Sequence, residues 1–368
     1  MKILEIAFHL APGGVERFVV DLSNELANRN DVTLLVLRDQ VLNNGYGCFY
    51  NDDVSDKVDF KCLGLQPGLS IKDWWRIYRA INRISPDIVH FHGEGMPFWM
   101  IVPIMFASRK IKFFQTIHSD IHNRYDRGIY KKLYIPLFVN RGRVKMVSLS
   151  PSNYKELLRI YPNAKATCIV NGRAEMSQTD KYEDVRNEIN SFRKSSKTLI
   201  FLHVGRCSKE KNQKRLVRAF NKLVENGFDA QLIIIGSGFD NDLGLELRDM
   251  ACKNIHFIGT RKNISDYQIC SDIFCLSSDY EGMPITLVEA LLCGTPVLST
   301  PVCGALDAIE SYNNGFVAED FSDEKYYEAM KLSYVHYETI SSRALQQKDS
   351  CPFTIKCCAD KYLNYFAN

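Results

Sequence analysis

Short apolar runs alternate with longer segments of helical apolar spacing along the whole chain. The apolar runs have the length and composition of buried strands and lie near residues 2–8, 32–37, 87–91, 112–117, 145–149 and 168–170, then near 198–204, 231–235, 255–258, 272–277, 296–299 and 316–318. Helices are predicted near 15–28, 71–84, 96–108, 128–140 and 151–161, then near 211–226, 240–251, 264–270, 284–293 and 322–335. This alternation indicates parallel sheets that are covered by helices on both faces.

The alternation runs through two rounds, which are separated by the polar stretch Asn171 to Ser196. A chain of 368 residues exceeds the ~250–300 at which single cores usually stop growing. We therefore expect an α/β protein of two doubly wound, Rossmann-like domains over residues 1–180 and 181–350. The active site of such a pair is expected in the cleft between the domains, at the carboxyl ends of both sheets. A last segment, Phe353 to Phe366, has helical apolar spacing.

The most informative segment, Ser277 to Ser299, places two glutamates near the start of a predicted helix. Pro284 lies where the first helical residue is expected, because its fixed φ suits that position and its missing N–H is not needed there. Glu281 then lies in the loop before the helix, and Glu289 lies about 7–8 Å along the axis at ~1.5 Å per residue. Two carboxylates beside the free N–H groups of a helix N-terminus suit a ligand with hydroxyls and phosphate. The alternative is a capped surface helix with two solvated acids.

This run, Glu281-Gly-x-Pro followed by Glu289-Ala-x-x-x-Gly-x-Pro-Val, resembles the donor-site motif of the family-four retaining glycosyltransferases of the GT-B fold (glycosyl transferases group 1). In that family the first glutamate meets the transferred sugar and the second holds the ribose of the nucleotide. The resemblance implies a catalytic role for Glu281 and a ribose contact for Glu289. It also places the intervening residues in the donor site, namely Gly282, Met283, Pro284, Ile285 and Thr286.

A basic loop follows the first strand of the second half. The strand runs to Gly205, Arg206 comes next, and Lys211 lies at the predicted start of a helix. An arginine and a lysine at such a turn can clamp a diphosphate, although a basic residue there is also often merely solvated. The Gly-Arg-x-x-x-x-Lys spacing resembles that of the family, which implies catalytic and donor-binding roles for Arg206 and Lys211. The tight turn at Gly236, after the next strand, is expected in the same donor cleft, although glycines also serve simple chain reversal. By the resemblance, the base lies over Thr260 to Ile264.

The first half has a glycine-rich turn after its first strand. The turn resembles the Gly-Gly-x-Glu turn of the family, and Gly13, Gly14 and Glu16 match it. The resemblance implies donor contact for Gly14 and acceptor-side positions for Gly13 and Glu16. The turn lacks the Gly-x-Gly-x-x-Gly spacing, which counts against a dinucleotide-dependent oxidoreductase.

Two histidines at strand ends are further candidates, His118 in Gln-Thr-Ile-His and His92 in His-Phe-His-Gly. In the family a histidine at the first of these points touches the donor sugar, which implies a catalytic role for His118. His92 is expected on the acceptor side. A histidine at a strand end is also often a structural hydrogen-bonding residue, and that alternative stays open here.

Two places depart from the family pattern. Arg173 and Ala174 follow an Asn-Gly pair where the family often has a small apolar residue and an acid, which leaves the acceptor side less defined. Asp307 stands where the family often has a glutamate, a change to a shorter acid.

The resemblance implies transfer with retention from a nucleoside-diphosphate sugar, most often a UDP-sugar. Basic side chains and helix N-termini would stabilise the charge on the departing diphosphate. A departing phosphate oxygen would accept the proton of the acceptor hydroxyl. The aspartate pair Asp52-Asp53 lies in a loop of the first half, away from the expected cleft, so we expect no metal requirement. The nucleotide sugar is a co-substrate, and no other cofactor is expected.

Composition and hydropathy favour a cytoplasmic enzyme. The sequence opens without the pattern of a signal peptide, and the longest apolar stretch, Met96 to Ala107, is shorter than the ~20 residues of a spanning helix. The 12 cysteines are scattered without a Cys-x-x-Cys pair, which fits reduced thiols.

Charge is uneven along the chain. Residues 1–180 hold 24 Lys and Arg against 18 Asp and Glu, a net charge of +6, and the remainder carries −3. Ten basic residues lie between Arg109 and Lys145 against Asp120 and Asp126. The aromatic residues interleaved with them are Phe113, Phe114, Tyr125, Tyr130, Tyr134 and Phe138. The segment is either a solvated basic face over core aromatics or a surface that rests on anionic lipid, whereas no nucleic-acid recognition module is visible.

We therefore expect a hexosyl- or N-acetylhexosaminyltransferase that acts on a glycan or lipid-linked saccharide in surface polysaccharide biosynthesis, such as capsule or lipopolysaccharide, at the inner face of a membrane. The alternative is a catalytically weak nucleotide-sugar-binding partner of another transferase. In the family the C-terminal tail crosses back, so helix 351–368 is expected to pack on the first domain.

Overall fold

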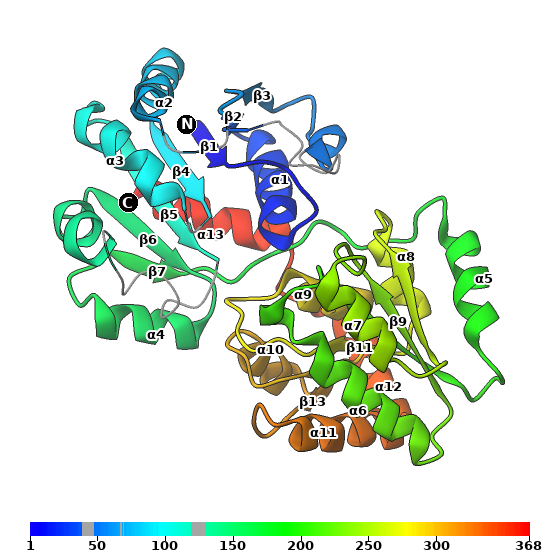
Figure 1. The fold of residues 1–368 in the computed structure, drawn as a ribbon. Coiled ribbons are helices and arrows are strands. Elements are labelled where there is room, and N and C mark those ends of the chain that lie inside the picture. The colour runs from blue at the N-terminus through cyan, green and yellow to red at the C-terminus, as the bar shows by residue number, and fades with distance from the viewer. Residues whose placement is uncertain (39–47, 67, 69, 94, 119–127, 129) are drawn as a thin grey trace. The chain divides into compact units, whose positions relative to one another are not determined.

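The computed structural model describes all residues except 39–47, 67, 69, 94, 119–127 and 129, and its side-chain description also leaves out residues 130, 131 and 310–312. The chain divides into two compact units. The first comprises Met1–Ala174 together with Ile355–Asn368, and the second comprises Glu175–Thr354 (Figure 1).

The first unit is built on a seven-stranded parallel sheet with the order β3-β2-β1-β4-β5-β6-β7. Its strands are β1 (Lys2–Ala7), β2 (Asp31–Val36), β3 (Asp59–Cys62), β4 (Ile88–His92), β5 (Lys112–Ile117), β6 (Val144–Ser148) and β7 (Ala166–Cys168). Its helices are α1 (Gly14–Ala27), η2 (Asn51–Asp53), α2 (Ile71–Ile84), α3 (Met96–Phe106), the π-helix η4 (Tyr130–Val139), α4 (Pro151–Ile160) and α13 (Ile355–Ala367). The strand order reverses between β1 and β4, so the carboxyl ends of these two strands form the topological switch point of a doubly wound sheet.

The two faces of this sheet differ in chemistry. Leu4 and Ile6 of β1 join an apolar core with residues of α2, α3 and η4. Because side chains alternate along a strand, Glu5 points to the opposite face. There His90 of β4 contacts the rings of Tyr362 and Phe366 from α13.

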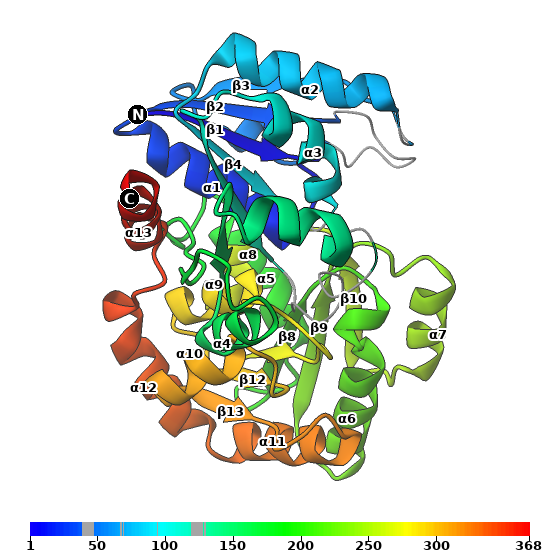
Figure 2. The same ribbon diagram turned by 90° about the vertical axis from the view of Figure 1, so that its left-hand side faces the viewer.

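The C-terminal helix α13 belongs to the first unit and lies beside α1, as both ribbon views show (Figures 1 and 2). Lys112 Nζ donates hydrogen bonds to the carbonyls of Phe366 and Ala367, at 3.1 and 3.0 Å. The last residues of the chain therefore complete the fold of the first unit.

The second unit repeats the design with a six-stranded parallel sheet in the order β10-β9-β8-β11-β12-β13. Its strands are β8 (Leu199–Val204), β9 (Ala230–Ile235), β10 (Ile255–Gly259), β11 (Ile273–Leu276), β12 (Val297–Ser299) and β13 (Gly315–Val317). Its helices are α5 (Tyr182–Phe192), η5 (Lys209–Lys211), α6 (Gln213–Glu225), α7 (Asp242–Met250), α8 (Ile264–Cys270), α9 (Ile285–Cys293), α10 (Ala305–Tyr312), α11 (Asp323–Val335), α12 (Tyr337–Gln347) and η6 (Lys348–Ser350). The switch point lies between β8 and β11.

The predicted α/β class and two Rossmann-like sheets are confirmed, with local differences. The strand β3 was not predicted, because its four residues are all exposed at the sheet edge and show no apolar run. Helix α5 lies inside the polar stretch that we predicted as the domain boundary. It was missed because it buries only Val185 and Ile189 and therefore shows little apolar spacing. Helices α10 and α12 were also missed. The predicted helix near 128–140 is a π-helix over Tyr130–Val139.

Within the described parts of the chain, no helix combines the length and apolar character needed to cross a membrane.

Candidate functional site

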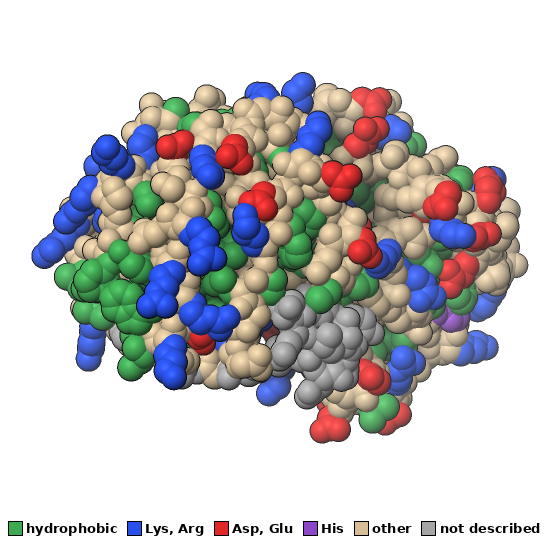
Figure 3. Space-filling view, turned by 90° about the horizontal axis from the view of Figure 1, so that it is seen from above, with side chains coloured by type: hydrophobic (Ala, Val, Ile, Leu, Met, Phe, Trp, Pro, Cys, Tyr) green, Lys and Arg blue, Asp and Glu red, His purple; other side chains and the backbone are tan. Residues whose placement is uncertain are grey.

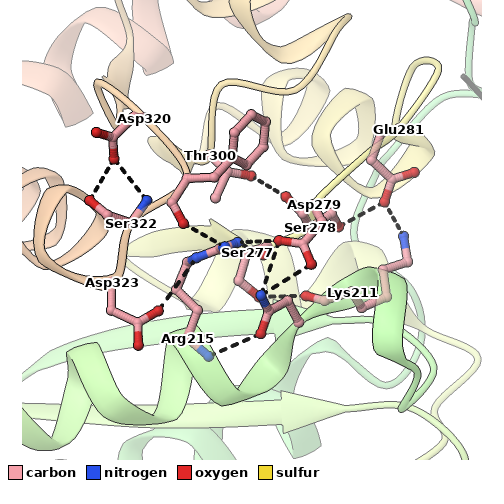
Figure 4. A network of polar contacts seen from close by, with 12 residues as sticks. Lys211, Arg215, Ser277, Ser278, Asp279, Glu281, Thr300, Asp320, Ser322 and Asp323 are labelled. Atoms are coloured by element: carbon pink, nitrogen blue, oxygen red, sulfur yellow. Dashed lines mark hydrogen bonds and ion pairs between the residues drawn. The ribbon is translucent and has the colours of Figure 1, made fainter.

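The loops that follow β8 and β11 meet at the switch point of the second unit. Lys211, the last residue of η5, places its Nζ 2.5 Å from Oε1 of Glu281, in the loop between β11 and α9. The same carboxylate oxygen accepts a hydrogen bond from Ser278 Oγ at 2.8 Å (Figure 4). The Lys211 and Glu281 side chains are only 23% and 16% exposed, so water screens this pair less than a surface pair.

Arg206 occupies a more open position in the same region. Its side chain is 66% exposed, and Nη2 lies 3.0 Å from Oε1 of Glu210. Burial acts to raise the pKa of Glu210, but hydrogen bonds from its own backbone N–H, from Ser208 and from Arg206 outweigh burial and leave the pKa lowered. The Arg206 guanidinium is thus oriented by a carboxylate and remains accessible to an anionic ligand.

Two residues that we did not predict, Gln213 and His203, support this basic loop through hydrogen bonds. Gln213 Nε2 donates to the carbonyl of Arg206 at 2.8 Å and lies 3.4 Å from Nε2 of His203. His203, at the end of β8, contacts the Cys275 carbonyl through Nδ1 at 2.9 Å. Burial lowers the pKa of His203 to about 4, so its ring is neutral and serves as a structural hydrogen-bonding group.

Arg215 of α6 ties the loop after β11 to the body of the unit (Figure 4). Its guanidinium donates to the carbonyls of Ser277 and Phe321, at 2.9 and 2.6 Å, and lies 2.8 Å from Oδ1 of Asp279. Asp279 also accepts from Asn212 Nδ2 at 3.0 Å. A buried arginine at the start of a basic helix gave no sequence signal, because its partners are distant in the chain.

Two glycines are required by close backbone approach. A Cβ on Gly236 would lie 2.0 Å from the Gly205 carbonyl oxygen, so the turn after β9 packs directly on the strand end that precedes Arg206. A Cβ on Gly304 would lie 2.8 Å from the Gly282 carbonyl oxygen and 2.7 Å from Met283 Sδ. Gly304 therefore packs against the loop that carries Glu281.

Helix α9 begins one residue later than we predicted. Pro284 is its N-cap residue with extended ψ, and Ile285 is the first helical residue. Proline suits the N-cap position as well, because the N–H of an N-cap residue makes no hydrogen bond within the helix. Glu289 lies in the second turn and is buried at 5% exposure, and Thr286 accepts a hydrogen bond from Gln268 Nε2 at 3.4 Å. The burial of Glu289 speaks against a solvated surface acid.

The loop predicted to face a base, Thr260 to Ile264, follows β10. Arg261 Nε donates to the Tyr267 hydroxyl at 2.9 Å, and that hydroxyl donates to Glu188 of α5 at 2.5 Å. The loop is thereby held against the helix that we did not predict.

In the first unit, the glycine-rich turn precedes α1. Gly14 is the first residue of α1, and Gly13 is its N-cap residue. A Cβ on Gly13 would lie 2.3 Å from Oε2 of Glu16, whose other oxygen lies 3.3 Å from His9 Nδ1. Glu16 thus folds back over the turn.

Arg173, at one of the two departures from the family pattern, has a structural role. Its guanidinium pairs with Asp21 of α1, and the Ala174 N–H donates to the same oxygen at 3.1 Å. Arg17 binds the other oxygen of Asp21 and also pairs with Asp53. The Arg-Ala variation therefore anchors the end of the first unit to α1.

The two candidate histidines of the first unit contact each other. His92 Nδ1 lies 3.0 Å from His118 Nε2, and His92 Nε2 lies 2.8 Å from Oε2 of Glu5. Glu5 also contacts His90 Nδ1 at 3.0 Å. Glu5 was missed as a site residue, although a glutamate in the middle of an apolar strand was a visible signal.

One assignment of protons satisfies this buried network. Glu5 accepts from both His90 Nδ1–H and His92 Nε2–H, which leaves His92 Nδ1 as the acceptor for His118 Nε2–H. His90 Nε2 then accepts from Thr116 Oγ1 at 2.7 Å, and Thr116 accepts from the Tyr362 hydroxyl at 2.8 Å. His118 is left with its Nδ1 lone pair as its remaining hydrogen-bonding group.

The ligand atoms of Glu5, His90 and His92 lie within 4.8 Å of one another, a spacing that a metal ion could bridge. All three side chains are fully buried, and each of these atoms already takes part in the hydrogen bonds of the network. We therefore interpret the group as a hydrogen-bonded network.

The predicted site residues thus fall into two groups. Arg206, Lys211, Glu281 and Glu289 lie at the carboxyl edge of the second sheet, where parallel α/β sheets bind ligands. Gly13, Gly14, Glu16, His92 and His118 belong to the first unit. The residues that follow His118 in the chain, 119–127, lie outside the described residues, and with them Asp120, Tyr125 and Asp126 of the basic segment.

Comparison with known proteins agrees with this geometry. A family model described as Glycosyltransferase Family 4 matches residues 12–173, and one described as Glycosyl transferases group 1 matches residues 184–336. An uncharacterized glycosyltransferase of Haemophilus influenzae is 28% identical over 333 residues, 87% of this chain and 86% of that protein. The UDP-Gal:alpha-D-GlcNAc-diphosphoundecaprenol alpha-1,3-galactosyltransferase of Escherichia coli is 24% identical over 269 residues, 70% of this chain and 69% of that protein.

Among solved structures, Anabaena HepE in complex with UDP and glucose has a TM-score of 0.79 at 17% identity and covers 100% of this chain and 99% of that chain. The two parallel Rossmann-like sheets have the GT-B fold of this solved structure. The chain belongs to the glycosyltransferases that these two family models describe, since its first half matches the Glycosyltransferase Family 4 model and its second half the group 1 model.

The buried network predicts a pH dependence for the first unit. Burial lowers the pKa of His92 to about 4 and that of His118 well below its usual value. The unfolded chain therefore binds protons below about pH 6.5 that the folded unit does not, and stability falls as the pH drops from 6.5 to 4. Burial acts to raise the pKa of Glu5, but its contacts with His90 and His92 outweigh burial and lower the pKa to about 2. The ionised Glu5 therefore stabilises the folded unit above pH 4.5, and this stabilisation is lost as the pH falls towards 2.

The three tryptophans, Trp74, Trp75 and Trp99, all lie in the first unit, so their fluorescence reports its unfolding alone. We expect the urea midpoint to fall between pH 7 and pH 5 and the fall to be smaller in His92→Asn. An equal fall in both proteins would contradict the assignment. His203→Asn, in the second unit, is the matched control and should leave this fluorescence profile unchanged.

Proposed function

We propose that this glycosyltransferase moves a sugar from a nucleoside-diphosphate sugar to a saccharide acceptor with retention of anomeric configuration. The observation that carries the proposal is the contact between Lys211 and Glu281 at the switch point. It unites a cation suited to a diphosphate with a carboxylate suited to sugar hydroxyls.

The placement of the other residues supports distinct roles. Arg206 is exposed beside Lys211 and can add a planar, two-pronged contact to phosphate oxygens. Glu289 is buried in the second turn of α9, where its carboxylate suits the ribose hydroxyls. Gly205, Gly236, Gly282 and Met283 form the closely packed backbone around these groups.

We take the donor to be a UDP-sugar that carries a hexose or N-acetylhexosamine. The Escherichia coli relative is named for a UDP-galactose donor, and the Anabaena structure contains UDP and glucose. Both similarities support the nucleotide more than the sugar. The acceptor of that relative is a saccharide on diphosphoundecaprenol, which supports a lipid-linked acceptor, surface polysaccharide synthesis and a peripheral position at the inner face of the membrane.

The chemistry follows from the charges. The bond between the anomeric carbon and the diphosphate oxygen breaks, and Arg206 and Lys211 stabilise the negative charge on the leaving group. The acceptor hydroxyl forms the new bond on the same face, and its proton passes to the departing phosphate oxygen. This scheme needs no metal ion. His118 would present its Nδ1 lone pair to a hydroxyl of the donor sugar, while Gly13, Glu16 and His92 lie on the acceptor side.

A nucleotide-sugar-binding partner with weak catalysis is the second candidate. It would keep the binding residues and lack turnover, so the following measurements separate the two.

Removal of either basic residue should impair the chemical step. We expect Arg206→Ala and Lys211→Ala to reduce turnover by at least ~100-fold, the scale of losing one charge-stabilising donor. Lys214→Ala is the matched control, because Lys214 lies three residues further on and pairs with Glu246. Near-normal turnover in both test variants, with the fold intact, would remove these residues from the mechanism.

The two glutamates should separate binding from catalysis. Glu289→Ala should mainly weaken nucleotide binding, because a ribose contact is made in the ground and transition states alike. Glu281→Ala should mainly lower kcat and relax sugar choice. Calorimetry with UDP is the measurement, and equal affinities of the wild type and Glu289→Ala would contradict the ribose assignment.

A thermal-shift screen of nucleotide sugars identifies the donor, because a ligand that binds only the folded state raises Tm according to its affinity. We expect UDP-sugars to give larger shifts than GDP-sugars. The opposite order would overturn the choice of uridine.

A further inference from the structure

Helix α2 presents an unusual outer surface. Ile71 and Trp75 are 70% and 41% exposed, and the half-buried Tyr78 continues the same stripe at the next turn. Their spacing of four and three residues places them one above another on the helix. Exposed apolar residues in a stripe of this kind often mark a binding surface.

The end of α3 extends this stripe. Met105 and Phe106 are 57% and 54% exposed. The Phe106 ring lies 5.4 Å from the Trp75 ring and 6.4 Å from the Tyr78 ring, measured between centroids. Two helices thus share one exposed apolar cluster, which we call the α2–α3 patch: Ile71, Trp75, Tyr78, Met105 and Phe106.

A basic stripe runs beside the patch. The exposed residues Lys72, Arg76, Arg79 and Arg83 follow one another at helical spacing on α2. Asp73 is the acidic residue of this helix, and it is buried and accepts a hydrogen bond from Arg76 at 3.2 Å. Arg109 and Lys110 are exposed just after α3. Figure 3 shows hydrophobic side chains gathered at one end of the first unit with Lys and Arg side chains beside them.

The basic segment singled out in the sequence does not form such a surface as a whole. Its aromatic residues Phe113, Phe114, Tyr134 and Phe138 are buried. Arg143 donates to the backbone carbonyls of Ile111 and Ser108, at 2.7 and 3.1 Å, and Lys112 binds the carbonyls at the end of α13. Lys145 lies over the rings of Phe114 and Tyr365. These three cations therefore serve the fold, and the four aromatic residues are core residues.

We propose that the α2–α3 patch and its basic stripe dock the protein on an anionic lipid bilayer. An apolar stripe beside a stripe of one charge sign matches a lipid interface, where acyl chains lie just below anionic headgroups. Tryptophan and tyrosine favour that boundary because one part of each ring system is apolar and the other is polar. The single sign of the charge matches the uniform negative charge of anionic lipid headgroups.

This inference rests on the peripheral membrane position proposed above and not on the proposed donor chemistry, because vesicle binding is measured without any sugar nucleotide. Urea unfolding followed by tryptophan fluorescence reports the first unit and serves as the check that each variant is folded, because Trp74 and Trp99 remain in every variant. Failure of one proposal can therefore be distinguished from failure of the other.

The test is co-sedimentation with vesicles of phosphatidylcholine and phosphatidylglycerol, compared with phosphatidylcholine alone. We expect binding to the anionic vesicles that weakens as salt rises from ~0.05 to 0.5 M, because screening shortens the reach of the charges. Arg79→Glu with Arg83→Glu should weaken it by at least ~10-fold, since each basic residue adds to the attraction. Trp75→Ser with Phe106→Ser should weaken it by at least ~10-fold through lost apolar burial.

Two double variants in the second unit are matched controls. Lys253→Glu with Lys331→Glu makes the same change in net charge at exposed positions, and Leu332→Ser with Val335→Ser removes apolar side chains that are 43% and 57% exposed. Both should bind vesicles like the wild type. In addition, vesicles should shift the tryptophan emission to shorter wavelength in the wild type and not in Trp75→Phe.

Three results would overturn the proposal. One is the absence of wild-type binding to anionic vesicles at low salt. Another is an equal loss in the control and test variants, which would indicate net charge alone. The third is loss of binding in Arg127→Glu with Lys132→Glu while the α2 and α3 variants bind normally, which would assign the contact to the basic segment; Arg127 lies outside the described residues, and Lys132 is exposed.

Discussion

The parallel course of β8 and β11 is the constraint on which the candidate site depends. Parallel neighbours end at the same sheet edge, so the loop that carries Lys211 and the loop that carries Glu281 must meet there, although 70 residues separate them. Their ion pair is largely shielded from water and so holds two charged groups in a defined geometry. In the proposed mechanism, a diphosphate at this edge would compete with Glu281 for the ammonium of Lys211.

The loops at this edge rest on a rigid support. Gln213, which contacts His203, donates a hydrogen bond to the carbonyl of Arg206, and the bare backbone of Gly236 packs against Gly205. Arg215 holds the opposite loop through two backbone carbonyls. Functional groups on loops need such support, because a loop alone leaves its side chains many conformations.

The first unit contains a buried carboxylate, that of Glu5 in β1. A buried charge is tolerated only when hydrogen bonds replace its water, and Glu5 receives them from His90 and His92. The network continues to Tyr362 on the last helix in one direction and to His118 in the other. The C-terminal helix is thereby linked through hydrogen bonds to a residue at the carboxyl end of β5. This link gives a physical reason why the final segment belongs to the first unit.

Much of the fold could be predicted from residues that are neighbours in the chain. Alternating apolar runs and helical spacing are local, so they indicated two doubly wound sheets, and the spacing around Glu281 and Glu289 indicated a helix with acids at its start. The strand β3 and the helix α5 escaped because they bury few side chains and leave no apolar pattern. The burial of Glu289, the partners of Lys211 and Arg206, and the Glu5 network depend on residues far apart in sequence. The stripes on α2 are also visible in the sequence, but only the packing of α2 against α3 decides which of its apolar side chains face water, because burial depends on neighbours that the chain brings together by folding.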